Sequence, residues 1–219
     1  MRCYGCLEDA EETRVPSKKK SLYAAERNRP DVREKREIWR EKAVGTDLSR
    51  FVFLDESGAK TDMTCLYARS FDGERIADST PQSHWHTTTM ISSLRLDGSS
   101  KSMAIEGATD GDVFQAYIDK VLSPNLNPGD IVVMDNLSPH RMHGVRKSIE
   151  AKGAQLWFLP PYSPDMNPIE KMWSKIKAFL RKVKARTEEV LFIAIGEALK
   201  TVTAADATGW FASCGYTQA

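Results

Sequence analysis

Cysteine is scarce in this 219-residue sequence, and the cysteines present do not form a metal-ligand set. A structural zinc site needs four ligands, usually in two matched pairs. One Cys-x-x-Cys pair occurs, and no second pair has a matching spacing. The sequence therefore argues against zinc or redox chemistry at Cys3, Cys6, Cys65 and Cys214. Such sparse usage is typical of a reducing cytoplasm.

Long apolar runs and an excess of one charge sign are also missing. No run approaches the ~20 apolar residues of a membrane span, and the first residues lack the apolar core of a signal peptide. We therefore expect a cytoplasmic protein without a membrane partner. The 31 Lys and Arg residues nearly balance the 30 Asp and Glu residues, which leaves a formal net charge of +1. Any binding to nucleic acid must then rest on local clusters of basic side chains.

Residues 1–45 differ in character from the rest of the chain. About the first sixteen carry mixed charge without an apolar period, and we expect them to lack stable structure. Pro30 and Gly45 bracket a charged segment that predicts a helix over 31–42. Trp39 would place this helix on the main domain, but the segment has too few apolar residues for its own core. We interpret 1–45 as an extension or linker and 46–219 as one compact domain.

The compact part alternates short apolar runs with segments of helical period. Strands are predicted at 51–54, 65–69, 87–96, 102–105, 131–134 and 155–159. Helices are predicted at 110–122, 142–151 and 168–185, followed by a last helix that Thr187 caps. The tail at 209–216 is expected to pack back onto the domain. This order indicates an α/β fold with a mixed sheet flanked by helices.

Two of the apolar strands run directly into an aspartate. Asp55 follows the strand at 51–54, and Asp135 follows the strand at 131–134. In open α/β sheets, ligands and catalytic groups gather at the edge where strands end. If the two strands are neighbours, the carboxylates lie side by side and repel unless a cation or a proton lies between them. The alternative is that each aspartate is an ordinary turn residue after its strand.

A proline-rich loop leads to a third acidic residue. Asn167 is suited to cap the helix at 168–185 through its side-chain oxygen, and Pro168 fits the first helical position. Glu170 is then three residues past the cap, where a capping-box role is the simplest interpretation. Together with Asp55 and Asp135 it would instead complete a hard-oxygen site for Mg²⁺ or Mn²⁺. Two such ions support phosphodiester cleavage by activating water and stabilising the leaving oxygen.

The same helix carries a row of basic residues. Lys177, Arg181 and Lys184 lie on the flank of its apolar stripe that also holds Glu170. A carboxylate followed by a basic row suits a helix that lies along a phosphate backbone, so we expect these three residues to contact DNA. The alternative is a solvated face of an amphipathic helix.

Three blocks resemble the signatures of the mariner-like superfamily of DDE transposases, in particular its bacterial insertion-sequence branch. They are 54–58 (Leu-Asp-Glu-Ser-Gly), 134–140 (Met-Asp-Asn-Leu-Ser-Pro-His) and 160–173, which opens Pro-Pro-Tyr-Ser-Pro and contains Asn-Pro-Ile-Glu. The resemblance implies a ribonuclease-H-like fold with Asp55, Asp135 and Glu170 as the metal-binding triad. It also implies cleavage at the ends of a mobile element, then attack of the freed 3′-hydroxyl on target DNA, commonly at TA.

Some further residues belong to these blocks or lie near them. In the second block, Asn136 would orient Asp135 or a metal-bound water, and His140 would contact DNA or order the loop. For both, a role in loop structure alone stays open. His84-Trp85-His86 is a candidate metal pair, but we favour a structural role because the matching family region is a strand edge. Glu56 would point away from Asp55 and is not assigned to the metal.

The resemblance also implies partners. We expect double-stranded DNA, a homodimer or higher oligomer in the DNA complex, and a nucleoid-associated location. Related transposases carry helix-turn-helix domains before the catalytic domain, but only 54 residues precede Asp55 here. We therefore expect an upstream frame to encode the recognition domain. The alternatives are a truncated or vestigial transposase that binds DNA without specific turnover, and a general ribonuclease-H-like nuclease.

Overall fold

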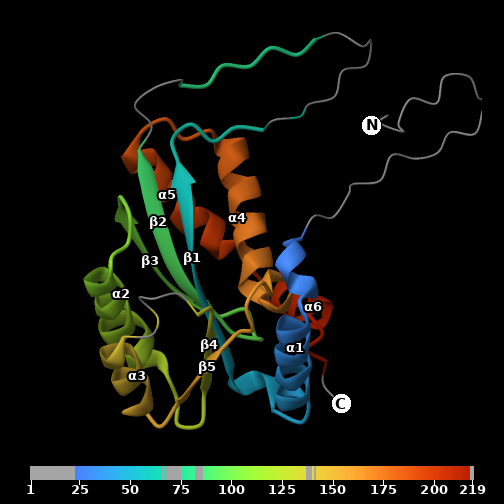
Figure 1. The fold of residues 1–219 in the computed structure, drawn as a ribbon. Helices are drawn as coiled ribbons and strands as arrows, with labels where there is room; N and C mark the ends of the chain where they lie inside the picture. The colour runs from blue at the N-terminus through green and yellow to red at the C-terminus, as the bar shows by residue number, and fades with distance from the viewer. Residues whose placement is uncertain are drawn as a thin grey trace, which may run out of the picture.

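A five-stranded mixed sheet forms the centre of the protein (Figure 1). The computed structural model describes residues 23–65, 67, 75–81, 86–136, 140 and 142–217. The strand order is β3-β2-β1-β4-β5, with β1 antiparallel to β2, β2 antiparallel to β3, and β4 parallel to both β1 and β5. The bounds are β1 (Phe51–Lys60), β2 (Thr87–Leu94), β3 (Ser100–Glu106), β4 (Ile131–Met134) and β5 (Gln155–Phe158). The expected α/β mixed sheet is confirmed, whereas the disorder expected for the first sixteen residues falls outside the described residues.

β1 is longer than its apolar run predicts. It pairs with β4 only over the first three residues, and then continues because β2 pairs with it as far as Lys60. Asp55 therefore lies within a strand and not after one, which corrects the sequence-based expectation. The strand predicted at 65–69 is not present at its described positions, Cys65 and Tyr67. Its other positions lie outside the described residues.

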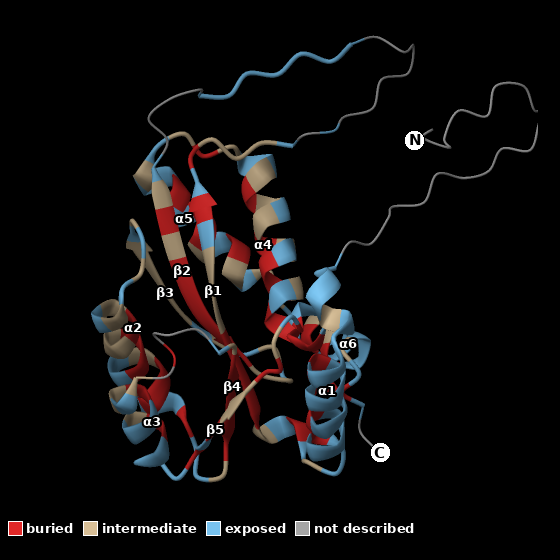
Figure 2. Cartoon of the chain, in the orientation of Figure 1, coloured by how far each residue is buried: buried red, intermediate tan, exposed pale blue. Residues whose placement is uncertain are grey.

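Helices cover both faces of the sheet, which explains why the central strands are apolar throughout. Phe51, Phe53 and Val133 pack on one face with the helices α1 (Pro30–Ala43), α4 (Pro168–Val183), α5 (Glu188–Lys200) and α6 (Ala204–Ser213). Val52 and Leu54 point to the opposite face, as the two-residue period of a strand requires. There they pack with α2 (Gly111–Tyr117), its π-helical continuation (Ile118–Leu122) and α3 (His143–Glu150). Figure 2 shows the buried residues running through the sheet between these two layers.

The two ends of the described chain meet on the α4 face. Trp39 of α1 is buried, and its indole N–H donates to the Tyr216 hydroxyl at 3.0 Å. The Tyr216 hydroxyl in turn donates to the Met166 carbonyl at 2.8 Å. The expected packing of Trp39 and of the tail is thus confirmed. Helix α6 was not predicted from the sequence, although Thr203 and Asp206 form a complete capping box at its start.

A buried arginine ties α1 to the proline-rich loop before α4. Arg36 is 3% exposed and donates to the Ser163 hydroxyl at 2.6 Å. Its guanidinium also contacts both carboxylate oxygens of Asp165, at 3.0 and 2.7 Å. This two-point geometry suits arginine and fixes the loop in orientation as well as position. No helix in the described part of the chain is both long and apolar enough to cross a membrane.

Removing the partner of this buried guanidinium tests how strongly the loop is held. We expect Asp165→Ala to lower the free energy of unfolding by about 3 kcal/mol, because it leaves a buried charge without its counter-ion. The matched control is Asp31→Ala, which removes an exposed, solvent-screened ion pair with Arg29 and should have a much smaller effect. Urea unfolding followed by circular dichroism measures both. Equal effects of the two substitutions would contradict this account.

Candidate metal centre

The register of β1 and β4 brings two acidic residues to the same place. Phe53 pairs with Val133 at the end of the parallel ladder. Asp55 and Asp135 each lie two residues beyond that pair, so the strand period directs both toward the face that α4 covers. Two carboxylates from different strands therefore meet beside the start of α4, as the sequence predicts.

Asp55 shows the electrostatic consequence of this arrangement. Burial, together with the charges of Glu170 and Asp135, raises its pKa to about 7. A hydrogen bond at 2.8 Å from the Glu56 backbone N–H opposes the rise only in part. A pKa this far above the ordinary value means that the site resists a third negative charge. A divalent cation is the ligand that would relieve this resistance.

Glu170 belongs to the same site and does not form a capping box. Although the residue as a whole is exposed, partial burial of its carboxyl raises its pKa; Lys177 opposes this rise and Asp135 adds to it. The Asn167 backbone N–H, which a capping box would offer to Glu170, donates instead to the Pro164 carbonyl at 3.1 Å. Glu170 is therefore turned to the cavity that it shares with Asp55 and Asp135.

Asn167 occupies the N-cap position, but the predicted side-chain cap is wrong. Its side chain accepts no hydrogen bond from the first turn of α4. The side-chain oxygen is buried and has no hydrogen-bond partner among the described residues. A buried polar atom of this kind is uncommon and points to an absent water, ion or ligand group. Because Asn167 lines the cavity of the three carboxylates, its oxygen adds a neutral donor to that site.

The cavity has a volume of about 370 Å³ and is walled by the proline-rich loop. Its lining residues are Asp55, Asp135, Asn136, Leu159, Pro160, Pro161, Tyr162, Ser163, Pro164, Asn167 and Glu170. Tyr162 has a φ of 54°, in the left-handed region that non-glycine residues rarely adopt. Strained backbone of this kind clusters at functional sites.

The donor set fits a hard divalent cation. Three carboxylates and an amide oxygen are the ligand types that Mg²⁺ and Mn²⁺ prefer. The structure gathers the three carboxylates around one cavity without bringing all three within 4.8 Å of one another. Among the described residues, the group that meets that spacing is His86, Glu106 and Glu188. Three observations indicate that the triad suits a metal ion: its ligands are all oxygens, the three residues line one cavity, and the charges of Glu170 and Asp135 act on Asp55.

His140 is buried directly behind the site. Its Nδ1 lies 2.6 Å from an Asp135 carboxylate oxygen, and its ring packs against Phe114 with centroids 4.4 Å apart. Burial alone would lower its pKa, but the contacts with Asp135 and Glu56 raise it to about 9. The imidazole is thus placed to orient Asp135, and its 1% exposure favours this role over contact with DNA.

Glu56 has a role that was not predicted from the sequence. Glu56 does point away from the triad, but its carboxylate lies 3.7 Å from the His140 Nε2 on that opposite side. Because His140 and Glu56 meet only through tertiary folding, no local pattern could have revealed the pair. The predicted supporting residue Asn136 is exposed and lines the cavity.

The basic row of α4 is only partly available to a ligand. Lys177 lies close enough to Glu170 for its charge to oppose the rise in the Glu170 pKa. This agrees with the predicted position of both residues on one flank of the helix. Arg181 is half-buried in the last turn. Lys184 ends the helix with a φ of 55° and forms an ion pair at 2.6 Å with Asp78 of the β1–β2 connection.

Comparison with known proteins identifies the fold and then the family. The Mos1 transposase in its paired-end complex with the left transposon end aligns with a TM-score of 0.72 at 17% identity, covering 91% of this chain and 63% of that one. The catalytic domain of Mos1 mariner transposase aligns with a TM-score of 0.60 at 16% identity, covering 87% and 90%. These matches confirm the ribonuclease-H-like fold.

A family model described as DDE superfamily endonuclease matches residues 50–191. The chain belongs to this superfamily. It is also 28% identical over 102 residues to the transposable element Tcb1 transposase of Caenorhabditis briggsae, an alignment that covers 45% of this chain and 37% of that protein. The chain thus spans little more than a third of the curated relative that it matches.

The unusual cap of α4 gives a testable consequence for stability. We expect Asn167→Ala to change the free energy of unfolding by less than about 0.5 kcal/mol, because no cap hydrogen bond is lost and a buried unpaired oxygen disappears. Thr203→Ala is the matched control at the capping box of α6 and should cost about 1 kcal/mol. Denaturant unfolding of both variants decides the matter. A loss in Asn167→Ala as large as that in Thr203→Ala would show that its side chain caps α4 after all.

Proposed function

We propose that this chain is the catalytic domain of a transposase that cuts DNA at the ends of a mobile element and joins the freed 3′-hydroxyl to target DNA. The observation that carries the proposal is the shared cavity of Asp55, Asp135 and Glu170 in a member of the DDE superfamily endonucleases. The fold neighbours support it, since they include a Mos1 strand transfer complex with a TM-score of 0.68.

In this proposal the three carboxylates would hold Mg²⁺ or Mn²⁺, as a pair of ions. Mos1 paired-end complexes have been solved with Mn and with Mg, which supports divalent-metal use. Divalent metal held by these residues would supply activation of the attacking oxygen and stabilisation of the leaving oxygen of the phosphodiester. Water attacks phosphorus in the cleavage step and releases a 3′-hydroxyl. That hydroxyl then attacks a target phosphodiester and displaces its 3′-oxygen.

The chain's own residues place the reactants. Asp55 lies within β1 and Asp135 directly follows β4, and placement on or beside strands limits reorganisation when ligands bind. His140 fixes the Asp135 carboxylate from behind, and Asn136 lines the cavity and would orient a water there. Ordered second contacts of this kind typically change metal affinity or activity by about 10- to 100-fold.

DNA binding is proposed along α4, through Lys177, Arg181 and Lys184. Lys177 is the best placed of the three, because it lies on the flank of Glu170. Lys184 would have to exchange its Asp78 partner for a phosphate. The proposed partners are double-stranded element ends and target DNA, commonly at TA, and a second copy of the chain. Recognition of the ends would come from an upstream helix-turn-helix product, with the complex acting at the nucleoid in the cytoplasm.

Substitution of one triad residue tests the enzymatic proposal. We expect Asp135→Asn to abolish Mg²⁺-dependent cleavage of DNA carrying the terminal repeats that flank the gene, while binding of that DNA persists. Asp112→Asn, an exposed carboxylate on α2, is the control and should cleave like the parent. Gel assays of cleavage and of mobility shift, with and without the upstream product, provide the readout.

Two outcomes would contradict this proposal. Equal cleavage by Asp135→Asn and the parent would remove Asp135 from the catalytic machinery. Binding of the repeats that is insensitive to the triad, with no cleavage by the parent in Mg²⁺ or Mn²⁺, would instead support a vestigial protein that binds DNA without turnover.

A further inference from the structure

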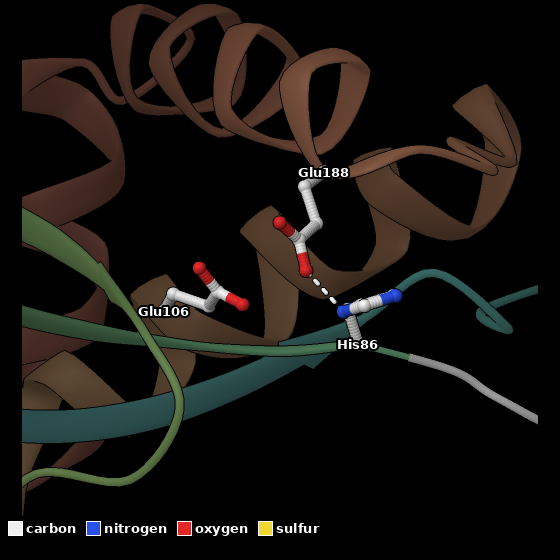
Figure 3. Close-up of side chains that lie close together, drawn as sticks. All are labelled: His86, Glu106 and Glu188. Atoms are coloured by element: carbon white, nitrogen blue, oxygen red, sulfur yellow. Dashed lines mark ion pairs between the residues drawn. The ribbon is translucent and has the colours of Figure 1, made fainter.

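A second group of metal-ligand side chains lies outside the cavity of the triad. His86 immediately precedes β2, Glu106 is the last residue of β3, and Glu188 is the first residue of α5. One potential ligand atom from each lies within 4.8 Å of the other two. Figure 3 shows the three side chains, from three separate elements, pointing toward one another.

Backbone contacts fix where each of these side chains begins. The β2–β3 ladder pairs Thr88 with Glu106, which brings the end of β3 beside the start of β2. The His86 backbone N–H donates to the Thr61 hydroxyl at 3.1 Å, and the His86 carbonyl accepts from the Thr61 N–H at 3.3 Å. Glu188 opens α5 directly after its N-cap residue, Thr187. The group is therefore assembled by secondary structure and not by three independent surface side chains.

Two carboxylates share this group with a single histidine. Glu188 Oε1 forms an ion-pair contact with His86 Nδ1. That oxygen is shielded from solvent. A second carboxylate, that of Glu106, approaches the same point. Two carboxylates at this spacing repel each other unless a cation lies between them.

We propose that His86, Glu106 and Glu188 form a binding site for one divalent transition-metal ion, with Zn²⁺ as the favoured occupant. An imidazole nitrogen with two carboxylates is a donor set that suits Zn²⁺ better than Mg²⁺, because nitrogen ligands select the later transition metals. The three protein ligands leave a fourth position for water. This site differs in chemistry from the triad, whose donors are all oxygens.

The bound ion would act as a brace between the sheet and α5. It would join the start of β2 and the end of β3 to the first turn of α5. His86 was expected from the sequence to have a structural role at a strand edge, and metal binding would be the means of that role. The other two residues of the motif, His84 and Trp85, lie outside the described residues.

Calorimetric titration with ZnCl₂ tests the site in the full chain. The reference protein carries Asp135→Asn and Cys3→Ser, so that neither the triad nor the Cys3–Cys6 pair dominates the signal. We expect one Zn²⁺ to bind per chain. His86→Gln, Glu106→Gln and Glu188→Gln should each weaken binding more than about tenfold, whereas His143→Gln, at an exposed histidine on α3, should leave it unchanged.

Two further measurements separate loss of the site from loss of the fold. Circular dichroism without metal should show the same secondary structure in all variants. Zn²⁺ should raise the melting temperature of the reference protein but not of the Glu188→Gln variant, because a ligand of the folded state stabilises it by mass action. The absence of a Zn²⁺ isotherm, or an isotherm equally strong in all three glutamine variants, would overturn the proposal and leave a His86–Glu188 ion pair only.

Discussion

The parallel pairing of β1 with β4 is the contact on which the candidate site depends. Three residue pairs suffice to set the register, and that register places Asp55 and Asp135 two residues beyond the same rung. A slip of one residue would turn one of them to the opposite face of the sheet. The apolar residues of both strands prevent such a slip, because alternate positions are buried in two different core layers. The same burial that holds the strands therefore brings two charges together.

The third carboxylate is positioned by a loop and not by the sheet. Arg36 holds the loop through Ser163 and Asp165, and the loop in turn fixes where α4 begins. Glu170 follows in the first turn of α4, where the partial positive charge of a helix N-terminus favours a carboxylate. Helix α1 thus contributes to the site from more than a hundred residues away in the sequence, through a side chain that is itself buried. This explains why a mostly charged segment carries one buried arginine among its exposed residues.

Local sequence patterns predicted most of the strands and helices, and they also indicated Asp55, Asp135 and Glu170 as candidate site residues. Apolar runs marked the central strands, helical periods marked the helices, and Thr187 does cap α5 as expected. What the sequence could not show depends on tertiary partners: β2 sets the length of β1, and Glu56 finds His140 from the other side of the strand. The cap at Asn167 was mispredicted for a different reason. Residue type predicts its N-cap position, but its side chain makes no hydrogen bond to the first turn of α4.

The central claim is that Asp55, Asp135 and Glu170 bind divalent metal as one site. The most direct measurement is a crystal structure of the chain grown with Mn²⁺, in which anomalous scattering locates the ions. The account predicts Mn²⁺ in the cavity with an oxygen of each carboxylate at a ligand distance of roughly 2.0–2.6 Å. It would be contradicted if Mn²⁺ bound elsewhere and left this cavity without an ion, or if Glu170 stayed outside the coordination shell.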